Sequence, residues 1–193
     1  MSPGEPQVQR LYSEEEARRW GDAALRPAVS MTRNAPEWLG DFKLRMFGNY
    51  RGRSPVPPSA VVGLGQDMIG AATRAGWELP PRGFTTIFVQ LYTVGQAVRP
   101  HTDPMDNIDC TLILGLGDFD AGEHLVTLPG RAWRRTLTPG ELLWLPCTWN
   151  GVRGPRHAVQ PLLRGSRWAV ILNAIEGVSR LDSLYPVPSE TLP

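Results

Sequence analysis

The run FTTIFVQLY (residues 84–92) opens the part of the chain that decides the fold. Further short apolar runs follow it: DCTLILGL (109–116), EHLVTLP (123–129), AWRRTLT (132–138), ELLWLP (141–146) and RWAVILNAI (167–175). Regularly spaced β-rich runs with turn residues between them, such as Pro129-Gly130 and Pro139-Gly140, predict antiparallel strands in a sandwich or barrel. We therefore expect a double-stranded β-helix, the jelly-roll form of the barrel, with functional residues at its open end.

The part of the chain before these runs predicts two helices that pack against the barrel. Ser13 to Glu16 has the pattern of a capping box, so a helix is expected from there to about Leu25. A second helix is expected over residues 59–75, ending before Gly76. Residues 1–10 are rich in Pro and Gly and are expected to be frayed. The expected fold class is α+β.

Length and composition fit a single domain. A chain of 193 residues can bury a sizeable core. We expect helical N-terminal support in residues 1–83, the jelly-roll core in residues 84–176 and a C-terminal tail in residues 177–193. The net charge of +1 gives no overall basic field for nucleic acid or acidic membranes.

Cysteine usage and hydropathy predict a cytoplasmic protein with reduced thiols. Cys110 and Cys147 lie in expected strands and form no C-x-x-C pair, so neither a disulfide framework nor a structural zinc site is expected. The N-terminal residues contain no apolar run of the signal-peptide type, and no segment is long enough to span a bilayer. No membrane contact and no obligate protein partner are therefore expected.

His101-Thr102-Asp103 is the motif that predicts chemistry. Residues i and i+2 of a strand share a face, so this tripeptide presents an imidazole and a carboxylate together. His157 follows after four plausible strands, enough for the chain to return to the first pair. Such a tripeptide alone is common on surfaces. Two imidazoles and one carboxylate on one face of a metal, however, are the ligand set of non-haem Fe(II) oxygenases, with open positions for substrate and O2.

Arg167 extends this prediction to a cosubstrate. It begins an apolar strand ten residues after His157, and a buried Arg there needs an anionic partner. The C5 carboxylate of 2-oxoglutarate would supply one. Tyr92 and Gln90 share a face of another strand and could bind the same cosubstrate, although a strand Tyr also fits plain sheet packing. His124 is expected to be an ordinary sheet residue, not a fourth ligand.

Residues 84–175 resemble the Fe(II)/2-oxoglutarate-dependent dioxygenase superfamily. The resemblance rests on His101, Asp103, His157 and Arg167, in this order and in this strand context. It implies iron bound by the two histidines and the aspartate, which would be the catalytic centre, and 2-oxoglutarate bound by Arg167. It also implies O2 as oxidant, with succinate and CO2 as co-products.

Within that superfamily the sequence is most similar to the ten-eleven translocation/J-binding-protein group. Those enzymes oxidise the 5-methyl group of thymine or 5-methylcytosine in DNA. The similarity rests on Asn107, shortly after His-x-Asp, and on the segment GDFDAGE (117–123). In that group the Asn helps to read the target base, and because Asp106 stands beside Asn107 here, either residue could take this role. The resemblance therefore implies a DNA substrate and hydroxylation of a 5-methylpyrimidine.

A DNA substrate makes two physical demands on the chain. The target base must leave the helix and stack in the pocket, for which Trp149 is the first candidate, with Trp144 and Trp77 also considered. Phosphates need cations, which the Arg-rich segments 51–53, 131–135 and 153–156 would supply.

Other readings stay open beside this one. A hydroxylase of a free amino acid, a prolyl peptide or a natural product would have an identical iron site, and a jelly-roll binding module would have a coincidental one. LYTVG (91–95) is similar to AlkB-type N-demethylases. Against that group, Asn173 stands where it has a second Arg, and Gln90 stands where it has an Asn. The small size suggests a compact bacterial or viral member, and a viral one would act in a host cell.

Overall fold

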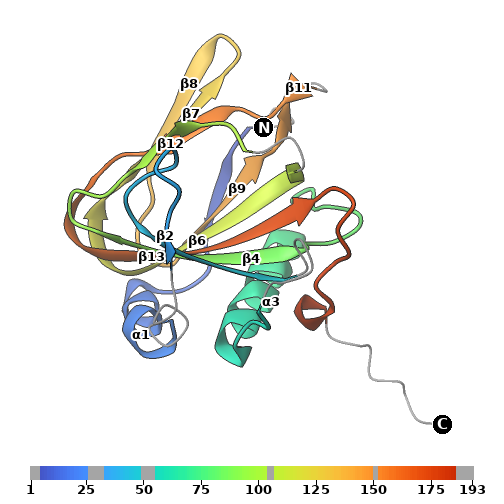
Figure 1. Ribbon diagram of the computed structural model, residues 1–193, viewed down its shortest axis with the longest axis horizontal. Helices are drawn as coiled ribbons and strands as arrows, with labels where there is room; N and C mark the ends of the chain where they lie inside the picture. Colours follow the sequence, from blue (N-terminus) through green and yellow to red (C-terminus); the bar gives the residue numbers. More distant parts are fainter. Residues whose placement is uncertain (1–4, 26–32, 49–54, 104–106, 150–151, 186–193) are drawn as a thin grey trace.

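The computed structural model describes residues 5–25, 33–48, 55–103, 107–149 and 152–185, and the fold given below is that of these residues. Most strands belong to one of two sheets, and many of these strands are labelled in Figure 1. The larger sheet has the order β1-β9-β6-β13-β4-β3-β2. Its strands are β1 (Gln7–Arg10), β2 (Arg33–Asn34), β3 (Lys43–Gly48), β4 (Thr86–Thr93), β6 (Asn107–Ala121), β9 (Glu141–Pro146) and β13 (Leu162–Ile175).

The smaller sheet has the order β5-β12-β7-β8 and lies on the side of the larger sheet opposite the helices (Figure 1). Its strands are β5 (Val98–His101), β7 (Glu123–Leu128), β8 (Arg131–Thr136) and β12 (Arg156–Val159), and a separate short pair joins β10 (Thr148–Trp149) to β11 (Val152–Arg153). From β4 to β13 the chain passes repeatedly from one sheet to the other, and neighbouring strands within each sheet are antiparallel. This is the expected jelly roll.

The part of the chain before the jelly roll is less helical than the sequence predicted. β1 pairs with β9 and places Val8 opposite Leu143, so the expectation of a frayed segment is wrong for Gln7–Arg10. β3 pairs with β4 on the other side of the sheet. Both strands extend the larger sheet and pair with backbone groups that an edge strand would leave exposed.

Two helices, α1 (Glu14–Ala24) and α3 (Ser59–Arg74), lie on the outer face of the larger sheet (Figure 1). Ser13 caps α1 as expected: its Oγ accepts from the Glu16 backbone N–H at 3.2 Å, and its own N–H donates to Glu16 Oε2 at 2.9 Å. A short 3-10 helix, η2 (Asp182–Leu184), packs against α3. Among the described residues, no helix is both long and apolar enough to cross a membrane.

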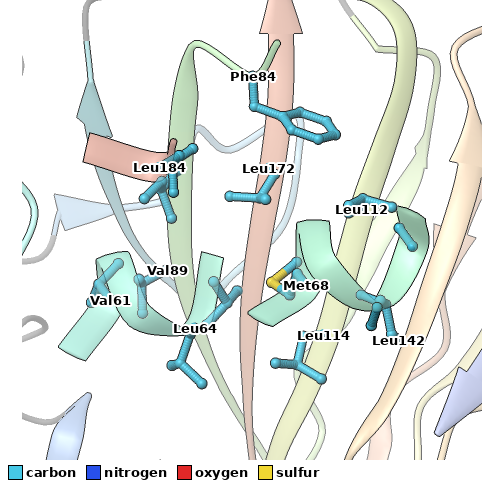
Figure 2. Packing of buried hydrophobic residues seen from close by; sticks show 14 of the residues in the cluster. Val61, Leu64, Met68, Phe84, Val89, Leu112, Leu114, Leu142, Leu172 and Leu184 are labelled. Atoms are coloured by element: carbon cyan, nitrogen blue, oxygen red, sulfur yellow. The ribbon is translucent and has the colours of Figure 1, made fainter. Parts of the chain in front are cut away.

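The main core lies between these helices and the larger sheet. Figure 2 shows Val61, Leu64 and Met68 of α3 packed against strand residues, and all three are fully buried. The strand partners in this cluster include Val89, Leu112, Leu114, Leu142, Val170 and Leu172. A second buried cluster, which includes Phe42, Ile113, Val126 and Leu143, draws its residues from both sheets.

Strand β13 shows how the two faces are divided. Trp168, Val170 and Leu172 belong to the core beneath the helices. Arg167, Ala169, Ile171, Asn173 and Ile175 line a cavity on the other face. Because successive strand residues point to opposite faces, the even positions stabilise the fold and the odd positions are available for chemistry.

Candidate active site

The cavity on the inner face of the larger sheet has a volume of about 520 Å³, within the usual range for small-molecule sites. It contains all three residues predicted as metal ligands, together with Arg167, Tyr92 and Gln90. Most of the remaining wall is apolar and includes Leu44, Met46, Phe88, Ile113 and Ile171. The polar groups are thus few and are held in an apolar enclosure.

His101, Asp103 and His157 form a compact cluster. Strand pairing sets their positions, since His101 of β5 and His157 of β12 are directly opposite each other in the antiparallel register. Asp103 Oδ1 lies 3.6 Å from His101 Nε2 and 3.7 Å from His157 Nε2. One ligand atom from each residue lies within 4.8 Å of the others, so one metal ion could bind all three.

The two imidazoles are oriented for metal binding by backbone carbonyls. His101 Nδ1 lies 2.9 Å from the Arg99 carbonyl oxygen, and His157 Nδ1 lies 3.2 Å from that of Pro155. A carbonyl can only accept, so each Nδ1 carries the proton and each Nε2 keeps a lone pair for a metal. Burial lowers the pKa of His157 and so favours its neutral form, which is the form that binds metals.

The second oxygen of Asp103 faces Thr111 and Cys147. Thr111 Oγ1 lies 3.5 Å from Asp103 Oδ2, and Cys147 Sγ lies 3.9 Å from the same oxygen. Burial, together with the charge of Asp103, raises the pKa of the Cys147 thiol well above its usual value, so the sulfur stays protonated. Cys110 and Cys147 are both buried free thiols. A neutral thiol does not compete with the histidines for a metal.

Arg167 is a buried cation whose charge no described carboxylate neutralises. Its side chain is 1% exposed, and Nη2 lies 2.7 Å from His124 Nε2. Nε and Nη1 have no hydrogen-bond partner among the described residues. Burial lowers the pKa of the guanidinium to about 10, so the group is still charged at neutral pH. An unpaired buried charge costs several kcal/mol by general estimates, and an anionic ligand would offset this cost.

Two glycines lie beside the unpartnered nitrogens. A Cβ atom at Gly115 would lie 3.6 Å from Arg167 Nε, and one at Gly122 would lie 3.6 Å from Nη1. Tyr92 is directly opposite Arg167 in the β4–β13 register, and its hydroxyl donates to Gln90 Oε1. Burial raises the pKa of Tyr92, so the phenol is neutral. The structure thus brings the predicted cosubstrate residues together.

The residues predicted to read a DNA base are only partly described. Asp106 lies outside the described residues. Asn107 begins β6 and Trp149 ends β10, but their side chains are not described. The other two tryptophan candidates are wrong: Trp77 and Trp144 are buried in the core beneath the helices. Trp144 lies two residues after Leu142 in the same strand, so both side chains point to the core and away from the cavity.

The Arg-rich segments contribute less free positive charge than expected. Residues 51–53 lie outside the described residues, and the side chain of Arg153 is not described. Arg131 pairs with Glu5, and Arg135 pairs with Glu141 at 2.7 Å. Arg156, next to His157, is exposed, and its Nη2 donates to the Pro100 carbonyl oxygen at 3.3 Å. Nearby acidic residues therefore already neutralise the charge of Arg131 and Arg135, two of the arginines predicted to contact phosphates.

Two residues of the site were missed by sequence reasoning. Trp38 is 58% exposed, lines the cavity, and has its ring centroid 6.0 Å from that of His101. It lies in the turn before β3, where the sequence has no repeating pattern to distinguish it. His124 was expected to be an ordinary sheet residue. It is a strand residue of β7 outside the metal cluster, but its hydrogen bond to Arg167 gives it a further role.

Comparisons with known proteins place this geometry in a known fold. No protein-family model matches the sequence, and no curated protein matches it. Solved structures do match. The chain is similar to a prolyl-4-hydroxylase from Pseudomonas putida, with 16% identity, a TM-score of 0.61, and coverage of 91% of this chain and 95% of that one. It is also similar to an oxidoreductase of the 2OG-Fe(II) oxygenase family from Burkholderia pseudomallei, with 14% identity, a TM-score of 0.63, and coverage of 93% and 87%.

The chain has the fold of the 2OG-Fe(II) oxygenases. A prolyl hydroxylase from Trichoplax adhaerens, solved with a peptide fragment of hypoxia inducible factor, matches with 15% identity and a TM-score of 0.65, covering 90% of this chain and 84% of that one. At this level of identity the likeness concerns the fold.

Replacing one predicted ligand should weaken metal binding. We expect Asp103→Ala to weaken Mn(II) binding at least about tenfold, because the cluster loses its only described carboxylate and its only formal negative charge. Asp120→Ala, which removes an exposed carboxylate outside the cluster, serves as the matched control. Calorimetric titration with Mn(II) measures both. Equal affinities for the two variants would show that the metal binds elsewhere.

Proposed function

We propose that the protein is an Fe(II)- and 2-oxoglutarate-dependent dioxygenase. One observation carries the proposal: a cluster of two imidazoles and a carboxylate shares one cavity with a buried arginine whose charge lacks a described counterion. The first feature suits Fe(II), and the second suits a dicarboxylate that reaches from the metal to the guanidinium. A metal site alone would not require a buried arginine, and a buried arginine alone would not require metal ligands beside it.

The metal ligands have defined roles in this proposal. His101 Nε2, His157 Nε2 and Asp103 Oδ1 would hold the metal, while the carbonyls of Arg99 and Pro155 fix the imidazole tautomers. Fe(II) bound there would supply O2 activation, coupled to oxidative decarboxylation of 2-oxoglutarate to succinate and CO2. The apolar wall around the ligands limits access of water to the reacting groups.

The cosubstrate residues act at the other end of the cavity. Arg167 would bind the C5 carboxylate through Nε or Nη1, the nitrogens that the fold leaves without partners. Tyr92 lies opposite Arg167 and its hydroxyl donates to Gln90; turned away from Gln90, the hydroxyl would be a second donor for that carboxylate. A carboxylate that accepts bonds from both groups would offset the cost of burying the guanidinium.

For the oxidised substrate we propose the 5-methyl group of a cytosine or thymine in DNA. The support is the resemblance of the segment 117–123 and of Asn107 to the DNA-oxidising group. Asn107 follows the ligand Asp103 by four residues and begins the strand that carries Thr111 into the cavity. Arg99 and Arg156 are exposed beside the metal ligands and offer cations for phosphates at the rim.

Trp38 adds a physical argument for a ring-shaped substrate group. The backbone N–H of Arg99 donates to the carbonyl of Leu39 at 2.8 Å, which holds the turn of Trp38 against β5. The indole lies beside His101 while more than half of the surface of Trp38 stays exposed. A base removed from the helix could stack on it, and such stacking typically contributes about 1–3 kcal/mol.

A prolyl peptide is the second candidate substrate. Two of the similar structures are described as prolyl hydroxylases, one of them in complex with a peptide. The apolar wall formed by Leu44, Met46 and Phe88 would also suit a pyrrolidine ring. Both candidates place a C–H group near the same metal ligands, so the assay must compare them directly.

Product analysis distinguishes the substrates. With Fe(II), 2-oxoglutarate and O2, we expect 5-methylcytosine DNA to yield an oxidised nucleoside by mass spectrometry, with succinate formed in parallel. A proline-containing peptide serves as the competing substrate, and Asp103→Ala controls for metal-independent oxidation. Hydroxyproline formation without any oxidised base would establish the second candidate instead.

Removing the exposed indole should affect only the oxidised substrate. We expect Trp38→Ala to lower kcat/KM for that substrate by roughly tenfold or more, since one stacking contact is lost. Affinity for 2-oxoglutarate should stay within about twofold of the original, because the cosubstrate residues Arg167 and Tyr92 are unchanged. Val94→Ala, at a similarly exposed apolar residue outside the cavity, is the control. A Trp38 variant with unchanged kcat/KM would remove the stacking role.

A further inference from the structure

His124 is a cavity residue that metal binding does not explain. It lies on β7 of the smaller sheet, is 4% exposed, and is not part of the metal cluster. Its Nε2 is 2.7 Å from Nη2 of Arg167, which lies on β13 of the larger sheet. This hydrogen bond therefore joins the two sheets across the cavity. Among the described residues, His124 is the hydrogen-bond partner of the guanidinium, and Nε and Nη1 have none.

The direction of this hydrogen bond fixes the state of His124. A guanidinium can only donate, so His124 Nε2 must accept and the imidazole must be neutral, with its proton on Nδ1. A protonated imidazole would place two donors and two positive charges in contact. Burial, followed by the charge of Arg167, lowers the pKa of His124 well below its usual value, which agrees with this geometry.

A neutral imidazole beside Arg167 leaves the charge of the guanidinium available, which a carboxylate in the same place would not do. A carboxylate in this place would both orient Arg167 and neutralise it, so a dicarboxylate ligand would have to compete with it. The imidazole orients the guanidinium and leaves its charge uncompensated. It also occupies only Nη2, and the two nitrogens beside Gly115 and Gly122 stay without partners.

We infer that His124 is a positioning residue for the cosubstrate: it holds the guanidinium of Arg167 in place while leaving its charge available to the distal carboxylate of a 2-oxo dicarboxylate. The inference rests on the proposed function. It assigns His124 no contact with the metal. The effect of His124 should therefore depend on whether the ligand carries a distal carboxylate.

Ligand binding to the Mn(II)-loaded protein without O2 tests this role. We expect His124→Leu, which keeps a similar volume but removes the acceptor, to weaken 2-oxoglutarate binding about 10- to 100-fold, by analogy with residues that orient metal ligands. His124→Gln restores an acceptor and should recover most of the affinity. Pyruvate has the same keto-acid end but no distal carboxylate, so its affinity should be the same in all three proteins.

Two further measurements separate positioning from a general structural role. Mn(II) affinity should be unchanged in His124→Leu, and this substitution should cost little additional 2-oxoglutarate affinity in a protein that already carries Arg167→Leu. Equal losses for pyruvate and 2-oxoglutarate, or a full additional loss in the Arg167→Leu background, would overturn the inference. So would undiminished binding of 2-oxoglutarate to His124→Leu. If the original protein with Mn(II) binds no 2-oxoglutarate, the proposed function fails as well.

Discussion

The two-residue periodicity of β13 is the constraint on which both the fold and the site depend. This strand lies between β6 and β4 in the larger sheet, so its backbone is paired on both sides. Trp168, Val170 and Leu172 pack beneath the helices, while Arg167 and its odd-numbered neighbours face the cavity. A shift of one residue in register would bury the arginine under the helices and expose the core residues to the cavity. Packing of the core therefore also fixes the place of the buried cation.

The electrostatic design of the cavity follows from this placement. Its metal end has one carboxylate and two imidazoles whose tautomers are fixed by backbone carbonyls. Its other end has a guanidinium held by a neutral histidine. The guanidinium of Arg167 suits a carboxylate. The nitrogen and oxygen atoms of the histidines and the aspartate, at the opposite end, suit a metal. One ligand with a chelating group and a distal carboxylate would satisfy both ends.

Much of the fold and the cluster could be predicted from the sequence, because both depend on local patterns. Short apolar runs separated by turn residues predicted the jelly roll, and His-x-Asp with a later histidine predicted a cluster that strand pairing brings together. The β1 and β3 strands were not predicted, since their pairing depends on distant partners. Trp38 and the His124–Arg167 contact were missed for the same reason: a turn and a bond between two sheets leave no periodic signal.

In the proposed function, the metal cluster and Arg167 bind opposite ends of the same molecule. Linkage tests it most directly, because two ligands that bind together must change each other's affinity by the same factor. We predict that Mn(II) strengthens binding of 2-oxoglutarate, that 2-oxoglutarate strengthens binding of Mn(II) equally, and that succinate, which lacks the keto group, shows much weaker coupling. Independent binding of Mn(II) and 2-oxoglutarate, with no coupling in either direction, would contradict the claim.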